Sequence, residues 1–221
     1  MDDKTNVLQK EYKKRFESNC AYRDSVWQIL CRDFLSHYVK GDSIVLDLGA
    51  GWGEFSRNIK AKKIYAMDLN PDCGDLVPGY VDFIQQDCSA RWPFDNETLD
   101  VIFTSNFLEH LLSKVAVDAT IREAHRCLKK GGSIICIGPN IRYVAGQYWD
   151  FWDHYIPITD RSMVEALILG GFLVKESIPR FLPFTMSDGK NPPLIFVKAY
   201  LRMRFLWPLL GKQFFVQAIK T

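Results

Sequence analysis

Two kinds of hydrophobic pattern alternate along the chain. Short runs that are apolar on both faces, such as Ile44 to Leu48, are typical of buried parallel strands. Longer stretches such as 113–129 carry apolar residues at helical spacing. Further strand candidates are 64–68, 81–86, 99–105, 133–138, 172–177 and 213–219, and further helix candidates are 5–40, 52–60 and 161–169. This alternation predicts an α/β fold, with a doubly wound and mostly parallel sheet.

Capping residues support two of the predicted helix boundaries. Thr159-Asp160 can cap a helix over 161–169, and Gly170-Gly171 can close it. Gly41 is expected to end the helical N-terminal segment.

Three glycines at alternate positions follow the first strand candidate. The segment reads Val45-Leu46-Asp47-Leu48-Gly49-Ala50-Gly51-Trp52-Gly53. Glycines after a strand let the backbone turn sharply and approach a ligand, and the next helix directs its free amide groups to the same place. The segment therefore predicts a nucleotide-binding corner at the carboxyl end of a strand. The alternative is a tight turn that holds no ligand.

The glycine spacing restricts the nucleotide. A dinucleotide fingerprint has its third glycine at the sixth position, where this chain has Glu54, and no Gly-Lys-Ser/Thr follows to make a P-loop. The pattern Asp-x-Gly-x-Gly-x-Gly from Asp47 to Gly53 resembles motif I of class I S-adenosylmethionine-dependent methyltransferases. That cofactor carries an amino group and a sulfonium in place of phosphates, which an acidic corner suits.

The resemblance implies a set of cofactor-binding residues. An acid ending the second strand accepts hydrogen bonds from the ribose hydroxyls, and one after the third strand accepts from the adenine amino group. For the first of these acids, Asp68, the alternative is a surface aspartate before a turn. Cys88 follows the second acid, Asp87, and is expected to be a residue of the pocket wall rather than a redox centre. The implied residues are Asp47, Gly49, Ala50, Gly51, Asp68, Leu69, Asp87, Cys88, Asn106 and Phe107.

The resemblance is strong over about 40–140 and weaker to about 185, where the pattern is similar to bacterial methyltransferases of polysaccharide biosynthesis. It implies a seven-stranded sheet of order 3-2-1-4-5-7-6 with the last strand antiparallel. We expect one domain over 1–221. It would comprise a helical cap at 1–40, a cofactor-binding half at 41–140, and an acceptor-side half at 141–221 with a helical insertion at about 190–211.

A methyltransferase that acts on a hydroxyl needs a base, and histidine suits neutral pH. Of the four histidines, His37 and His125 lie in predicted helices, which leaves His110 and His154 with the neighbouring Asp153 as catalytic candidates. His154 belongs to the segment 142–157, in which six aromatic residues are interleaved with Asp150, Asp153 and His154 itself. This aromatic segment is expected over the pocket mouth, either to bind a sugar or only to shield the cofactor.

A metal is not expected. Relatives that bind a metal carry Glu-x-x-Glu-His, whereas this chain has Asn106 at the first position, so one hard anionic ligand is missing. The plainer interpretation is that Glu109 orients a helix start and that His110 packs under the sheet.

Composition and net charge bear on the partners and the cellular location of the protein. The chain has 221 residues, 48% hydrophobic and 24% charged, and its net charge of +2 is too small to indicate nucleic-acid binding. A polar N-terminus shows no signal peptide, and six scattered cysteines without a Cys-x-x-Cys pair indicate reduced thiols and a cytoplasmic protein.

The segment from Leu194 to Leu210 is apolar apart from three cations, Lys198, Arg202 and Arg204. Seventeen such residues make a poor membrane span. Packing on the domain, homodimer formation and contact with the inner membrane surface all stay open.

These features predict methyl transfer from S-adenosylmethionine to a small-molecule or saccharide acceptor, at oxygen. The alternatives are methylation of a quinone-like phenol or an amine, and a catalytically silent protein that binds the cofactor and a partner.

Overall fold

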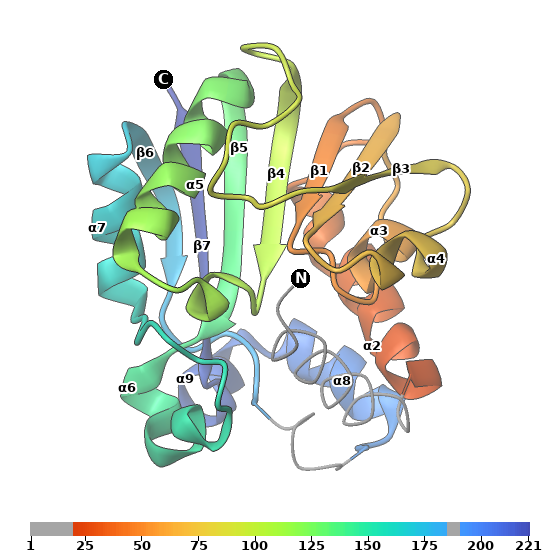
Figure 1. The fold of residues 1–221 in the computed structure, drawn as a ribbon. Helices are drawn as coiled ribbons and strands as arrows, with labels where there is room; N and C mark the ends of the chain where they lie inside the picture. Colours follow the sequence, from red (N-terminus) through yellow and green to blue (C-terminus); the bar gives the residue numbers. More distant parts are fainter. Residues whose placement is uncertain (1–19, 185–190) are drawn as a thin grey trace.

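The structure, a computed structural model, describes residues 20–184 and 191–221. Seven strands form one sheet in the order β3-β2-β1-β4-β5-β7-β6 (Figure 1). β7 pairs antiparallel with β5 and β6, and the other neighbouring strands are parallel. This confirms the predicted sheet order and the antiparallel last strand. The strands are β1 Ile44–Leu48, β2 Lys63–Asp68, β3 Val81–Gln85, β4 Leu99–Ser105, β5 Leu128–Pro139, β6 Phe172–Ile178 and β7 Gln213–Lys220.

Helices cover both faces of the sheet (Figure 1). Successive strand residues point to opposite faces, so on β5 Ile134 and Cys136 join one hydrophobic cluster while Ile135 and Ile137 join the other. The first cluster includes residues of α5 (Lys114–Cys127) and α7 (Asp160–Leu169). The second includes residues of α2 (Cys20–Asp33), α3 (Glu54–Asn58) and α4 (Asp72–Leu76). The fold is therefore doubly wound, as predicted.

The predicted caps of α7 are present. The Thr159 hydroxyl accepts a hydrogen bond from the Ser162 amide, and the Ser162 side chain accepts from the Thr159 amide in return. The helix ends at Leu169 with Gly170 as its C-cap, and Gly171 has a φ of +89°.

Two element boundaries differ from the prediction. β5 begins at Leu128, directly after α5, because Leu128 pairs with Leu99 ahead of a register shift in the ladder. The N-terminal helix ends at Asp33 and is followed by the short helix η1 (Leu35–His37), so the chain leaves the helix before Gly41. The expected helical residues 5–19 lie outside the described part of the chain.

Short helices gather at the end of the sheet toward which β4 points (bottom of Figure 1). They are η2 (Leu108–His110), α6 (Ile141–Val144), η3 (Ala145–Asp150), α8 (Leu194–Arg202), η5 (Arg204–Leu206) and α9 (Trp207–Leu210). The last three lie in the predicted helical insertion. It consists of separate helices because the backbone leaves helical geometry at Met203, where ψ is 71°. Tyr200 and Trp207 are buried, whereas Phe196 is exposed.

Candidate active site

A cavity lies beyond the carboxyl ends of β1 and β4. The glycine turn, the segment after β4 and the aromatic segment line it, together with α2 and the start of β7. Seven of the predicted site residues are in this lining: Asp47, Gly49, Ala50, Gly51, Asn106, His110 and His154. Side chains that the sequence reasoning did not select also line it, namely Arg23, Trp27, Glu109, Phe184 and Gln213.

The glycine turn has a conformation that few other residues adopt. Gly49, Gly51 and Gly53 have φ values of 71°, 53° and 71°. A Cβ on Gly49 would lie 2.1 Å from Cγ of Phe107, so the Phe107 ring packs directly on this glycine. A Cβ on Gly51 would approach nothing closer than the Gly49 carbonyl at 4.0 Å. The turn therefore leaves open space beside Gly51, on the wall of the cavity.

Asp47 fixes the start of α3. Its Oδ2 accepts hydrogen bonds from the Ser56 hydroxyl at 2.6 Å and the Ser56 amide at 3.2 Å. Burial raises the pKa of Asp47 to about 7, although the Ser56 hydrogen bonds oppose this. The acid of motif I thus holds the helix against the turn at the edge of the cavity.

Asp68 ties the glycine turn to β2. One carboxylate oxygen accepts from the Gly51 amide and the other from the Asn70 amide, each at 2.8 Å. Burial raises the pKa of Asp68. Each oxygen keeps a second lone pair, so the predicted ribose contact stays compatible with these bonds.

The acidic corner inferred from the sequence is less negative than expected. Glu54 is buried and forms an ion pair with Arg23 of α2, whose guanidinium lies 5.3 Å from the centre of the Trp52 ring. A signal for Arg23 was available in the sequence. It lies four residues before Trp27 and seven before Leu30, on the face of the helix that turns inward.

The other six predicted residues lie outside the cavity lining: Asp68, Leu69, Asp87, Cys88, Phe107 and Asp153. Asp87 Oδ1 accepts from the amide and hydroxyl of Ser89 at 2.8 Å, and the Leu69 side chain is exposed. Burial raises the pKa of Cys88 to about 11, so its thiol stays protonated at neutral pH. This argues against a redox role for Cys88, and the predicted wall role stays a prediction.

The two candidate histidines and Asp153 come together. His110 Nδ1 lies 2.9 Å from the backbone carbonyl of Asp153 and 3.2 Å from its Oδ2. Burial disfavours the imidazolium. The Asp153 hydrogen bond and the charges of Glu109 and Asp153 outweigh burial and raise the pKa of His110. His154 stacks on Phe151, and its ring centre is 4.8 Å from that of His110.

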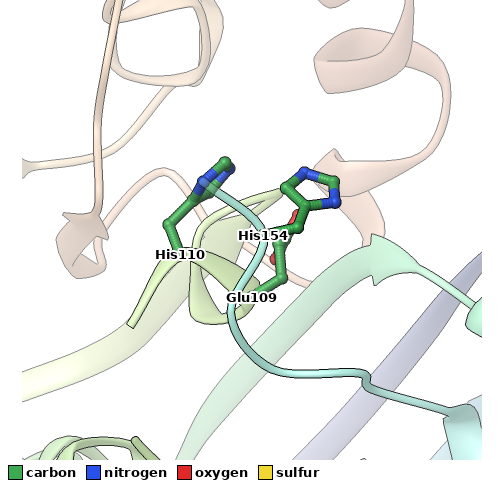
Figure 2. Close-up of side chains that lie close together, drawn as sticks. All are labelled: Glu109, His110 and His154. Carbon is green, nitrogen blue, oxygen red and sulfur yellow. The ribbon is translucent and has the colours of Figure 1, made fainter. Parts of the chain in front are cut away.

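Glu109 lies beside both histidines (Figure 2). One ligand-type atom from each of the three side chains lies within 4.8 Å of the others, and Glu109 is only 2% exposed. Burial raises the pKa of this carboxyl. The plainer interpretation of Leu-Glu-His is therefore incomplete, because both Glu109 and His110 line the cavity.

Two amide oxygens in the lining have no hydrogen-bond partner among the described residues. They are Oδ1 of Asn106 and Oε1 of Gln213, both buried. Asn106 has a φ of 49°, which is uncommon for a residue other than glycine. Unpaired buried acceptors and local backbone strain are both typical of ligand sites.

Comparisons with known proteins identify a methyltransferase domain in the chain. A family model described as a methyltransferase domain matches residues 46–136. A demethylmenaquinone methyltransferase of Symbiobacterium thermophilum is 26% identical over 160 residues, which cover 63% of this chain and 61% of that protein. The chain spans between half and two thirds of the length of the curated relatives it matches.

Solved structures extend the likeness to the whole fold. A S-adenosylmethionine-dependent methyltransferase from Archaeoglobus fulgidus superposes with a TM-score of 0.68 at 19% identity, covering 93% of this chain and 99% of that one. The [4+2]-cyclase SpnF has the same fold with a TM-score of 0.60 at 18% identity, covering 85% and 78%. Residues 46–136 thus match a methyltransferase domain, the chain has the fold of S-adenosylmethionine-dependent methyltransferases, and S-adenosylmethionine is the cofactor that this domain and fold imply.

Proposed function

We propose that the protein transfers the methyl group of S-adenosylmethionine to an oxygen of a small-molecule or saccharide acceptor. The observation that carries the proposal is that His110, paired with Asp153, lines the same cavity as the glycine turn. A hydroxyl loses a proton when it is methylated, and a histidine oriented by a carboxylate is suited to take it.

The residues present fit the cofactor. The open space at Gly51 admits a ligand close to the backbone, and the unpaired Asn106 Oδ1 can accept from an amino group. Gly49, Ala50 and Gly51 would hold the cofactor beside β1, with Asp68 next to its ribose. When bound, S-adenosylmethionine supplies a methyl group already activated by a sulfonium.

The chain's own side chains have distinct roles in this proposal. His110 accepts the proton of the acceptor hydroxyl at Nε2, because Nδ1 is engaged by Asp153. Asp153 is a positioning residue that fixes the ring and stabilises its protonated form. His154 and Phe151 form the neighbouring wall and limit the access of water to the base.

Two alternatives have specific support. The name of the Symbiobacterium relative favours a quinone-like phenol as the acceptor. The cyclase with the same fold shows that proteins of this fold can catalyse other reactions than methyl transfer. A catalytically silent protein that binds the cofactor and a partner, and methylation of an amine, are the remaining outcomes.

The test combines binding with turnover. We expect calorimetry to detect binding of S-adenosylmethionine and S-adenosylhomocysteine. We expect a radiolabelled methyl-transfer screen over sugars, glycolipids, phenols and amines to find an oxygen acceptor. Cofactor binding without any transfer would favour the silent protein, and transfer to amines alone would contradict the oxygen assignment.

The same screen decides on a metal. The cluster of Glu109, His110 and His154 has the ligand types of a divalent cation site, whereas the sequence predicts none. We propose that His110 acts as a base without a metal, so turnover should survive EDTA. Loss of turnover in EDTA that is restored by a divalent cation would replace the base with a metal centre.

We also propose contact with a membrane surface through the segment 194–210, which would place the protein peripherally at the inner membrane. Exposed apolar residues and three cations share this segment: Ile195, Phe196, Phe205, Leu209 and Leu210, with Lys198, Arg202 and Arg204. Within the described residues, no helix is both long and apolar enough to cross a bilayer.

Flotation with anionic liposomes tests this contact. We expect the protein to float and the Phe205→Glu, Leu209→Glu double variant to stay in solution. A wild-type protein that does not float would end the membrane proposal. Measurement of its molecular mass in solution would then address the homodimer.

A further inference from the structure

A second cavity, of about 360 Å³, lies between α2, α8 and the start of β7. This volume is in the range of small-molecule sites. Most of its wall is aliphatic or aromatic, including Leu30, Val197 and Leu201, and no charged residue is in its described lining. Tyr22 is one of its few polar residues, and the Tyr22 hydroxyl already donates to the Pro192 carbonyl at 2.7 Å. The interior therefore suits a ligand group that makes no hydrogen bonds.

The apolar cavity adjoins the candidate active site. Five residues line both cavities: Trp27, Ser105, Asn106, Pro183 and Gln213. The two unpaired amide oxygens, on Asn106 and Gln213, belong to this shared wall. The Gln213 amide is held in place, because its Nε2 donates to the Pro183 carbonyl at 2.8 Å. The Gln213 oxygen, and the second lone pair of the Asn106 oxygen, can thus bind a ligand hydroxyl at the junction, and the walls beyond them are apolar.

Part of the described lining of the apolar cavity is exposed and forms its mouth. Phe196, Met203 and Leu210 line it and are themselves exposed.

We propose that the apolar cavity binds the non-reacting part of the methyl acceptor, a hydrocarbon chain or an apolar ring system. The acceptor hydroxyl then lies at the junction, next to Asn106 and Gln213 and facing the cavity of His110. This inference rests on the proposed function and specifies its substrate class. A free, fully hydroxylated saccharide does not fit, because its hydroxyl groups would lack partners along the apolar wall. A saccharide would be accepted only when it carries an apolar group.

Calorimetry with 4-alkylcatechols tests the proposal, with S-adenosylhomocysteine present. Tails of one, four and eight carbons share one hydroxylated head. We expect affinity to rise by about fourfold for each methylene that becomes buried, until the cavity is filled. An affinity that does not depend on tail length would overturn the proposal.

Matched variants on α8 locate the tail. Val197 lines the cavity, whereas Ile195 is 66% exposed and does not. We expect Val197→Phe to weaken binding of the octyl compound by at least tenfold and to leave the methyl compound unchanged, and Ile195→Phe to change neither. Equal effects of the two variants would contradict the assignment.

A second pair covers the case in which Val197→Phe does not fold. Leu210→Trp obstructs the mouth, and Leu209→Trp is its exposed neighbour outside the lining. S-adenosylhomocysteine binding, measured separately, reports on the cofactor site. If the wild-type protein did not bind S-adenosylhomocysteine, the proposed function would be refuted. If it bound S-adenosylhomocysteine but its affinity for alkylcatechols did not depend on tail length, only this inference would be refuted.

Discussion

Replacing Gly49 with alanine should abolish S-adenosylmethionine binding and lower the melting temperature. An alanine in left-handed geometry costs about 1–2 kcal/mol. At Gly49 its Cβ would also overlap the Phe107 ring, at 2.1 Å from Cγ. Overpacking of this kind adds about 1–3 kcal/mol. The turn or the ring must move, and both belong to the predicted cofactor site.

Gly131→Ala is the matched control. Gly131 has a φ of 76°, close to the 71° of Gly49, but a Cβ there would meet nothing within 4 Å. It should therefore lose only the backbone part of the stability, a shift of about 2–8 °C for a chain of this size, and bind the cofactor normally. Differential scanning calorimetry and titration of S-adenosylmethionine compare the two variants.

The Phe107→Ala background separates the clash from the backbone strain. If the ring is the obstacle, Gly49→Ala should destabilise this background no more than Gly131→Ala destabilises the wild type. Undiminished cofactor affinity in the Gly49→Ala protein would contradict the assignment of the turn to the cofactor site.

The sheet was predictable because its signals are local. A strand buried on both faces is a mostly apolar run in the sequence, and β1 and β4 have the bounds that their runs predicted. The capping residues of α7 act within four positions of each other. The order of the strands came from the family resemblance, since no local pattern contains it.

The site was predictable only in part, because its missing members come from distant segments. Gln213 is separated from Asn106 by 107 positions, and nothing near it in the sequence indicates a ligand site. The pairing of Glu54 with Arg23 depends on how α2 packs against α3. His110 and Asp153, by contrast, were both candidates, His110 because His37 and His125 lie in predicted helices and Asp153 because it is the neighbour of His154. Their contact depends on tertiary structure.

The helical insertion at about 190–211 shows a second limit of prediction from sequence. Its apolar composition predicted helix, and helix is present, but in three pieces with different environments. A hydrophobic stripe does not reveal whether it faces a core, a cavity or solvent. Phe196 faces the cavity mouth while Tyr200 is buried, with its hydroxyl donating to the Phe181 carbonyl at 2.5 Å.

His110→Ala should lower kcat/KM by about 10²–10⁴, the usual contribution of a general base. The loss should fall on transfer and leave S-adenosylmethionine affinity unchanged. His125→Ala is the control, because this histidine packs against Phe172, with ring centres 5.1 Å apart, and is outside the cavity lining. Equal activities of the two variants would remove His110 from the mechanism.

The pH dependence of kcat/KM distinguishes a base from a residue that only packs. The neutral imidazole accepts the proton, so activity should fall as pH decreases through the pKa of His110. Because Asp153 and Glu109 raise that pKa, the acidic limb should lie above the ordinary histidine value of about 6.5.

Asp153→Asn tests the positioning role through the same profile. The asparagine removes a negative charge but keeps the backbone carbonyl that Nδ1 contacts at 2.9 Å. The pKa of His110 should therefore fall, and the acidic limb should move to lower pH while the maximal rate decreases. A merely structural role for Asp153 would lower the rate without moving the limb. A limb that moves to higher pH would contradict the ion pair, because removing an anion cannot stabilise the imidazolium.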